Sequence, residues 1–347
     1  MYKINQSANN PPIANINCPL GPLLEIFMLK HITRCMALSI AALATTAALA
    51  AGDKPLTIVV PTAAGGANDA MARTIGQKLG VLLGQPVVVD NKAGANGALA
   101  AEYVARAPAD GNTVMFGYVA THAMNPALQK LRYDPVSGFE PIGLVGYSPT
   151  LMVLNPGVKA KDLKDLVGQM KATPEKFSFA SAGNGTAPHF AAELFKIATQ
   201  TAPLHVPYKG SAPAITDTIG GQTQLMFPSL FTALPYVKAG KLRAMAVAGS
   251  KRSALLPEVP TLKEAGVDGV DVEQWYAFFA PAKTPKDVIV KLNTALNKVL
   301  ADKDTIKRLE DHGADVEAST PEQLGELVKR DLAKWKGVVQ KARLQAD

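Results

Sequence analysis

The sequence has no cysteine after Cys35, and the one other cysteine is Cys18. This absence excludes disulfides, zinc–thiolate sites and thiol nucleophiles from most of the chain. The five histidines show no His-x-x-x-His spacing, so we expect no metal and no cofactor. Stability must therefore come from a hydrophobic core, and 347 residues with 48% hydrophobic composition are enough to build one.

Long apolar runs are also scarce, and one near the N-terminus has the layout of a secretory signal. It covers Cys35–Ala50, which is shorter than the roughly 18 residues needed to cross a bilayer. Lys30 and Arg34 precede it, and a small-residue cleavage site, Ala48–Ala50, ends it. We therefore expect export to the periplasm with cleavage near Ala50, in preference to the alternative of a membrane anchor.

The segment in front of this signal does not resemble part of a fold. Residues 1–27 contain four prolines and no amphipathic pattern, so we expect the true start to be Met28 rather than Met1. Arg34 places a charge next to Cys35, where a lipid-attachment signal needs a small residue. The expected exported protein is therefore residues 51–347 without a lipid anchor.

Positive charge is in slight excess, but it is not concentrated. The full chain carries net charge +7, and removal of residues 1–50, with three basic residues and one acidic residue, leaves +5. Basic and acidic residues are mixed, as in KDLKD at Lys161–Asp165, and no arginine-rich arm is present. Nucleic acid is therefore not an expected partner. A mild positive field can still attract small anions.

Apolar runs alternate with helical patterns from Leu56 onward. This alternation predicts an α/β fold with mostly parallel sheets. The predicted strands are Leu56–Val60, Val87–Asp90, Thr113–Tyr118, Ile142–Tyr147, Thr150–Leu154, Phe177–Ala180, Gln224–Phe227 and Ala244–Ala248. The predicted helices are Asp69–Leu83, Ala98–Arg106, Lys161–Lys171, Pro188–Ala198, Ala212–Gly220, Lys286–Asp302, Asp304–His312 and Pro321–Ala342.

Two segments each combine a strand, a turn of small residues and a helix start. They read VPTAAGGANDAMAR at Val60–Arg73 and FSFASAGNGTAPHFAAELFKIA at Phe177–Ala198. A helix start presents unpaired N–H groups and a partial positive charge, so it attracts anions. The turns contain no Arg or Lys, and neutral donors suit a carboxylate that must bind and then leave. The alternative is that both are simply tight strand-to-helix turns.

Single residues in these segments have predicted roles. Asn68 is the expected N-cap of the first helix, with Asp69 in its first turn. Thr186 is the expected cap of the second helix, with Pro188 near its start. His189 lies in the first turn of the second helix and is the one histidine for which a functional role stays open.

Catalytic motifs are not found. No phosphate-binding P-loop occurs, and GNGTAP at Gly183–Pro188 has proline where a dinucleotide motif needs its third glycine. GYSPT at Gly146–Thr150 lacks the closing glycine of a nucleophile elbow. We therefore do not expect an enzyme, and the alternative is an exported hydrolase of an anionic substrate with His189 as its base.

Seven segments together carry a resemblance to a known family. In chain order they are VVPTAAGGANDAMAR, VVVDNKAGANGALAAEYVARAPADGNTVMFG, FASAGNGTAPHFAAELFK, HVPYKGSAPAITDTIGGQ, LPYVKAGKLRAMAV, LPEVPTLKEAG and WYAFFAPAKTPKDVIVKLN. In these segments the chain resembles the Bug-type receptors, the extracytoplasmic solute-binding proteins of tripartite tricarboxylate transporters.

The resemblance implies a two-lobed, type II periplasmic-binding-protein-like fold, with mixed sheets flanked by helices and a ligand cleft between the lobes. Lobe 1 would be residues 51–151 plus 275–347, and lobe 2 residues 152–274. The implied function is to capture a small organic acid without any catalytic step. The implied partners are that carboxylate and the large and small membrane subunits of the transporter, with the receptor acting as a monomer. A sensory role is a further alternative.

The resemblance also assigns ligand-binding residues by position. Those of the first loop are Thr62, Ala63, Ala64, Gly65, Gly66 and Asp69. Those of the second loop are Ser181, Gly183, Asn184, Gly185, Thr186 and His189. Thr121 is added because it follows the strand Thr113–Tyr118, at a loop that often faces the cleft.

Overall fold

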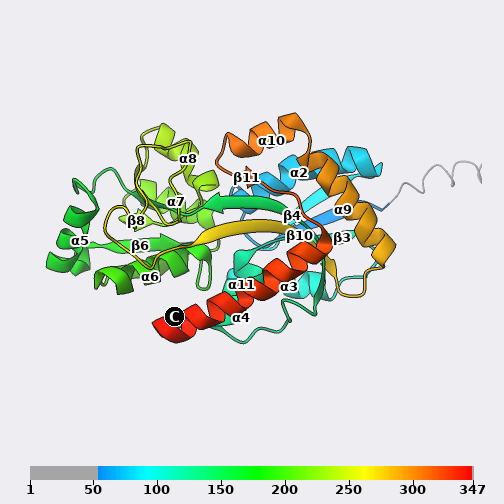
Figure 1. Ribbon diagram of the computed structural model, residues 1–347, viewed down its shortest axis with the longest axis horizontal. Helices are drawn as coiled ribbons and strands as arrows, with labels where there is room; N and C mark the ends of the chain where they lie inside the picture. Colours follow the sequence, from blue (N-terminus) through cyan, green and yellow to red (C-terminus); the bar gives the residue numbers. More distant parts are fainter. Residues whose placement is uncertain (1–53, 346–347) are drawn as a thin grey trace, which may run out of the picture. The chain divides into compact units, whose positions relative to one another are not determined.

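Eleven strands occur in residues 54–345, the part of the chain that the computed structural model describes. They are β1 (Leu56–Val60), β2 (Val87–Asn91), β3 (Thr113–Tyr118), β4 (Phe139–Pro149), β5 (Leu151–Leu154), β6 (Ser178–Ser181), β7 (Leu204–Pro207), β8 (Leu225–Met226), β9 (Arg243–Val247), β10 (Glu273–Pro281) and β11 (Asp315–Val316). They form one sheet in the order β11-β4-β10-β3-β1-β2 and a second in the order β7-β6-β8-β5-β9 (Figure 1).

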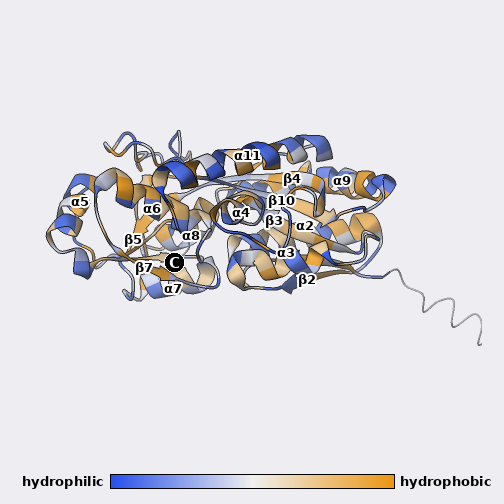
Figure 2. Cartoon of the chain, turned by 90° about the horizontal axis from the view of Figure 1, so that it is seen from below, coloured by the Kyte–Doolittle hydropathy of each residue, from blue (hydrophilic) through white to orange (hydrophobic). Residues whose placement is uncertain are grey.

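Helices flank both sheets. The α-helices are α2 (Ala67–Leu83), α3 (Ala98–Ala105), α4 (Asn125–Leu128), α5 (Leu163–Ala172), α6 (Ala187–Thr199), α7 (Ser211–Ile219), α8 (Leu230–Lys238), α9 (Lys286–Leu300), α10 (Lys303–Glu310) and α11 (Pro321–Ala342). Two 3₁₀ turns, η1 (Ala95–Gly97) and η3 (Pro174–Lys176), and a π-helix, η2 (Ala120–Met124), complete the described elements. Hydrophobic residues, orange in Figure 2, occur along both the helices and the strands.

Both sheets are mixed, and each contains a parallel strand–helix–strand unit. β1 pairs in parallel with β2 and β3, whereas β10 pairs antiparallel with β3 and β4. In the second sheet β6 pairs in parallel with β7 and β8, whereas β5 pairs antiparallel with β8 and β9. The predicted α/β class is confirmed, as are the mixed sheets that the resemblance implies. The expectation of mostly parallel sheets is wrong, because β10 and β5 each pair antiparallel with both of their neighbours. The units β1-α2-β2 and β6-α6-β7 occupy equivalent places in the two sheets.

Two neighbouring segments connect the sheets. Thr150 links β4 to β5, and the chain returns from β9 to β10 through residues 248–272. The Ala248 amide donates to the Thr150 carbonyl at 2.8 Å, and Gln274 Nε2 donates to Thr150 Oγ1 at 3.0 Å. Figure 1 shows β4 and β10 side by side where they approach the second sheet. These crossings lie next to the predicted lobe limits, which stay a prediction.

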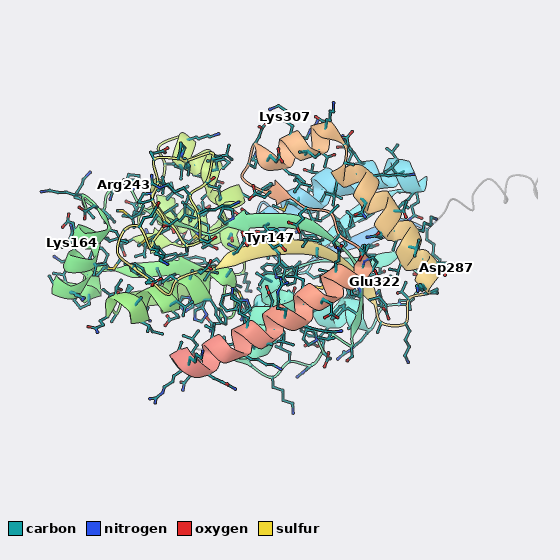
Figure 3. All side chains as sticks on the ribbon, in the orientation of Figure 1. Tyr147, Lys164, Arg243, Asp287, Lys307 and Glu322 are labelled. Atoms are coloured by element: carbon teal, nitrogen blue, oxygen red, sulfur yellow. The ribbon has the colours of Figure 1, made fainter. Side chains whose placement is uncertain are left out.

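Charged side chains lie mainly on the outside. Lys164, Asp287 and Lys307 are exposed and point away from the ribbon (Figure 3). Within residues 54–345, no helix combines the length and apolar character needed to cross a membrane. The predicted signal, its cleavage near Ala50 and the start at Met28 fall outside the described residues.

All of the predicted strands and helices occur, with bounds shifted by a few residues, but several elements were not predicted. These are the strands β7, β10 and β11, the helices α4 and α8, the 3₁₀ turns η1 and η3, and the π-helix η2. β10 is the largest omission because it is central to the first sheet, between β3 and β4.

Candidate functional site

Each of the two predicted loops contacts a segment that belongs to the other sheet's half of the molecule. The Ala63 amide donates to the Lys209 carbonyl at 3.3 Å, which joins the first loop to the second sheet. A Cβ added to Gly183 would overlap the Asn96 side-chain oxygen, so these two residues are in close contact. The loops that follow the carboxyl ends of β1 and β6 therefore both take part in contacts between the two halves of the molecule.

The first loop has a different helix start from the one predicted. Gly66 is the N-cap of α2, with φ −86° and ψ 175°, and no side chain caps the helix. The prediction of Asn68 as N-cap is therefore wrong, because the chain already enters the helix at Ala67. Asp69 instead closes the loop, since its Oδ2 accepts the Gly65 amide at 3.0 Å. This bond resembles one half of a capping box.

Asp69 is buried and ionised, and its charge is balanced. Burial alone would raise the pKa of Asp69, but hydrogen bonds from Arg73, Gly65 and Asn91 outweigh it and leave the pKa below 3.8. Arg73 Nε lies 3.0 Å from Asp69 Oδ1, and Arg73 also donates to Asn91 Oδ1 at 3.1 Å. In this structure Asp69 therefore braces the loop without adding net negative charge.

We expect Asp69→Asn to lower the free energy of unfolding at pH 7 by about 1–3 kcal/mol, because a buried charge-assisted network is weakened. The pKa of Asp69 is lower in the folded state, so its stabilisation is full above pH 3.8 and declines as pH falls through the folded pKa. Urea unfolding from pH 7 to pH 3 should show the two proteins converging. A difference that does not change with pH would contradict this explanation.

Asp165→Asn is the matched control. Asp165 Oδ2 accepts the Lys161 amide at 2.8 Å, which is the same contact four residues back at the start of α5. This helix start is exposed and lacks the arginine, so a smaller loss of stability is expected there.

Two buried donors of the first loop have no protein partner. Within the described residues, Thr62 Oγ1 and Asn68 Nδ2 make no hydrogen bond, although only 8% and 5% of these residues is exposed. A buried polar group without a partner costs about 1–3 kcal/mol. Both groups are therefore available to hydrogen-bond a ligand.

The second loop begins its helix as predicted, but it is held differently. Thr186 is the N-cap of α6 in an extended conformation, and Pro188 follows in the first turn. The Thr186 hydroxyl does not cap the helix. It donates to the Gly183 carbonyl at 2.5 Å, and the Gly185 amide donates to His189 Nδ1 at 3.3 Å. These contacts fix the shape of the loop.

A serine and two histidines support the same loop. Ser181 Oγ lies 2.7 Å from His205 Nε2 and accepts the Gly183 amide at 3.0 Å. The rings of His205 and His189 are 4.7 Å apart, and Ser181 is fully buried. Ser181 therefore lies beneath the loop and positions its backbone, and its assignment as a ligand-binding residue stays a prediction.

The hydroxyl of Thr121 makes its hydrogen bonds to neighbouring residues of lobe 1. It accepts the Tyr118 amide at 3.2 Å and lies 2.9 Å from His122 Nδ1. Burial lowers the pKa of His122 to about 3, so this imidazole is neutral. Thr121 shapes the π-helix η2, and its assignment as a ligand-binding residue stays a prediction.

The comparisons with known proteins give the family. The model of the TctC family, described as tripartite tricarboxylate transporter family receptor, matches residues 71–344. The chain belongs to this family. BugT of Bordetella pertussis is 35% identical over 82% of this chain and 88% of its own. MatC of Rhodopseudomonas palustris, solved with bound malate, is 35% identical with a TM-score of 0.80, covering 82% and 98% of the two chains.

A second R. palustris structure, solved with adipate, is 32% identical with a TM-score of 0.81 and covers 84% of this chain and 98% of its own. These matches give this TctC-family receptor the two-lobed periplasmic binding protein fold with two mixed sheets. The family is one of transporter receptors, so the protein is a binding protein and not an enzyme. Membership of this family therefore argues against the alternative of an exported hydrolase with His189 as its base.

A third loop of the receptor contacts the first loop but lies outside the predicted ligand-binding set. It is Tyr208–Gly210, between β7 and α7, and a Cβ on Gly210 would lie 3.2 Å from the Ala63 amide nitrogen. Helix α7 also starts without a side-chain cap. The signal in the sequence was a further short strand, glycine and helix start, VPYKGSAPA. The Tyr208 hydroxyl donates to Asp217 at 2.7 Å, while burial and this carboxylate raise the pKa of Tyr208 to about 12.

The predicted ligand-binding residues differ in exposure. Ala64 and Gly65 are exposed, Ala63 and Asn184 are half-buried, and the others are buried. Their role in binding stays a prediction. Among residues 54–345, no three His, Cys, Asp or Glu side chains are grouped so that they could hold a metal ion.

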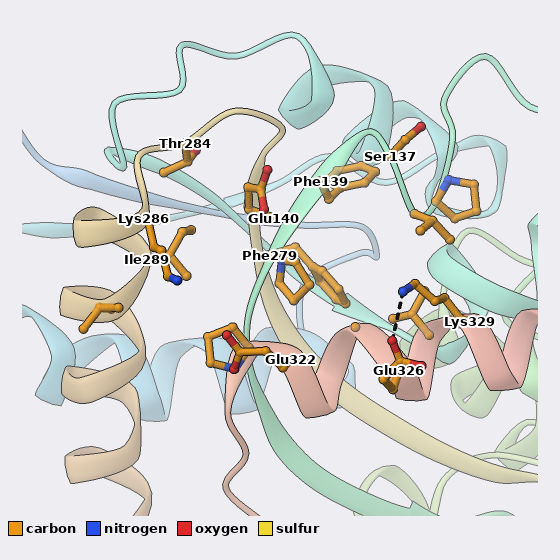
Figure 4. A pocket seen from close by; sticks show the side chains of 17 residues that line it. Ser137, Phe139, Glu140, Phe279, Thr284, Lys286, Ile289, Glu322, Glu326 and Lys329 are labelled. Atoms are coloured by element: carbon orange, nitrogen blue, oxygen red, sulfur yellow. Dashed lines mark hydrogen bonds and ion pairs between the residues drawn. The ribbon is translucent and has the colours of Figure 1, made fainter.

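A separate cavity of about 640 Å³ lies away from these loops, between α9, α11 and the strands β4 and β10. Figure 4 shows Phe139 and Phe279 between the two helices, with Glu140, Lys286 and Glu322 around them. None of the predicted ligand-binding residues lines it. It is therefore distinct from the candidate site.

Proposed function

We propose that this receptor captures a small organic acid between its two lobes and delivers it to a tripartite tricarboxylate transporter. The start of α2, after Gly66, takes one end of the acid, and the start of α6, after Gly185, takes the other. The observation that carries this proposal is that two equivalent strand–loop–helix units, one from each sheet, each contact the opposite half of the molecule. Closure over the acid is favoured because the closed form brings both sets of donors to it.

The electrostatics of the loops support a carboxylate. Helices α2 and α6 begin without side-chain caps, so their first amides remain able to bind oxygen atoms. Thr62 and Asn68 add two buried donors. The acidic residue of the first loop, Asp69, is paired with Arg73 at 2.9 Å, which reduces its repulsion of an anion.

The relatives support an acid with two carboxylates. The two structures with bound ligand hold malate and adipate, which both have a carboxylate at each end. An acid of this kind matches one anion-attracting helix start in each lobe. We propose dicarboxylates as the first class to test, with citrate-like acids, aromatic acids and acidic amino acids as other candidates.

We propose that the receptor is exported to the periplasm and acts there with membrane partners. Translation starts at Met28, and residues 28–50 act as the export signal and are removed, so the receptor is residues 51–347 in the periplasm. It acts as a monomer and binds the large and small membrane subunits of the transporter.

Titration calorimetry on refolded residues 51–347 tests this function. We expect one-to-one binding of one acid from a panel of malate, adipate, citrate, benzoate and glutamate, with the acid recovered unchanged by chromatography. Unfolding and refolding first removes any ligand carried over from the cells. Conversion of the acid, or no heat from any member of the panel, would contradict the proposal.

A further inference from the structure

Two asparagines outside the predicted set contact the second loop from the first lobe. The side-chain oxygen of Asn96 occupies the space that a Cβ on Gly183 would take. Asn125 is the corresponding neighbour of Gly185, where an added Cβ would lie 2.8 Å from its Oδ1 and 3.1 Å from its Cα. Each asparagine therefore fits against a glycine of the opposite lobe.

The backbone around Asn96 is held in an unusual conformation. Ala95 and Asn96 have φ of +44° and +56°, between two glycines that also have positive φ. Such angles cost roughly 1–2 kcal/mol for alanine and persist where the surroundings impose them. The end of this segment is tightly packed, because a Cβ on Gly97 would lie 2.7 Å from Thr121 Cγ2 and 3.0 Å from Pro61 Cβ.

Asn125 is fixed just as firmly. It is fully buried at the end of the π-helix η2, a rare element that frequently marks functional sites. Its Oδ1 accepts from Gln129 Nε2 at 2.7 Å, and its Nδ2 reaches the Asn96 carbonyl at 3.5 Å. The two asparagines are thus linked to each other and pre-positioned within the first lobe.

We propose that Asn96 and Asn125 form a closing latch, positioning residues that fill the hollows beside Gly183 and Gly185 only when the lobes are closed. The latch holds part of the population closed even without ligand and slows ligand release once an acid is bound. This inference rests on closure over a ligand, as in the proposed function. Contacts made only in one state shift the equilibrium toward that state.

The absence of cysteine after Cys35 makes the test direct. Val81→Cys on α2 and Ile197→Cys on α6 place one spin label on an exposed site of each lobe. Pulsed electron-spin distance measurements on ligand-free residues 51–347 should then show a closed and an open separation. Asn96→Gly keeps the positive φ but removes the side chain, and we expect it to lower the closed-to-open ratio about fivefold or more.

Asn125→Ala should act in the same direction and serves as the second variant. Asn112→Gly, in a turn of the same lobe, is the matched control and should keep the wild-type ratio. A wild type with only the open separation, or an Asn96→Gly variant that keeps the closed one, would overturn the latch. Because no ligand is present, this result is independent of whether the receptor binds a carboxylate.

Stopped-flow binding adds a kinetic readout, with malate and adipate as the probes. If either binds, Asn96→Gly should raise koff about fivefold or more and leave kon within about twofold, since the latch forms after the encounter. A loss confined to kon would contradict the proposal. Thermal unfolding should stay cooperative in each variant, which separates a latch from a general loss of structure.

Discussion

Leucine in place of Gly66 is expected to abolish ligand binding while the receptor still folds. Gly66 has φ −86°, which any residue can adopt, and a Cβ there would meet only Ala63 O at 3.7 Å and Thr62 Oγ1 at 4.0 Å. The substitution is therefore not strained. A leucine side chain would instead occupy the start of α2, where the amides are proposed to receive a carboxylate.

The expected loss of affinity is roughly 100-fold or more, which corresponds to about 2.8 kcal/mol. Calorimetry with the acid that binds the wild type measures the affinity, and thermal unfolding by circular dichroism checks the fold. Gly337→Leu is the control, because that glycine lies in α11 with no atom within 4 Å of an added Cβ. Retained affinity in Gly66→Leu would contradict the assignment of the first loop.

Local signals were enough to find both loops. Each has an apolar strand, a run of small residues and a helix start within about twenty residues, so no distant contact is needed to recognise it. The same reasoning placed the N-cap correctly at Thr186 and wrongly at Asn68. The first helix differs because its N-cap is Gly66, which has an extended conformation and no side chain that could mark it as a cap. Asp69 accepts the Gly65 amide instead, and this contact could not be predicted from the residue types alone.

Strand β10 shows what pattern reasoning missed in the fold. Its residues EQWYAFFAP are buried at every position but the first, so no alternation of polar and apolar residues marks a strand. Its partners are also remote in sequence, as in the pairs Tyr276–Tyr118 and Trp275–Tyr147. Helix α8 was missed for a different reason, because Pro235 lies inside it.

The latch residues could not be predicted because their role depends on the opposite lobe. Asn96 lies in a glycine-rich segment, AGANGA, which indicates a turn, and Asn125 precedes a proline, which indicates a helix boundary. Neither signal identifies a partner. The partners are Gly183 and Gly185, and these pairs come together only through the arrangement of the two sheets.

Alanine in place of Gly185 is expected to weaken ligand binding by roughly 5- to 150-fold, because overpacking of this kind costs about 1–3 kcal/mol. Gly185 has φ +75°, so alanine is strained there, but that strain is the same in the open and closed forms. An alanine Cβ would overlap Asn125 in this structure, and on the latch proposal this overlap exists only in the closed form. The variant should therefore fold, with some loss of stability, and favour the open separation in the spin-label measurement.

A double-variant cycle decides whether the overlap is the cause. Asn125→Ala removes the oxygen 2.8 Å from the new Cβ but leaves the Asn125 Cα at 3.1 Å, so it should restore the affinity of Gly185→Ala only in part. Gly168→Ala, in a helix with no atom within 4 Å, is the control and should bind as the wild type does. If Gly185→Ala binds within twofold of the wild type, or if the two substitutions are simply additive, Asn125 does not meet Gly185 in the ligand-bound form. If the second substitution partly reverses the first, the two residues are in contact when the ligand is held.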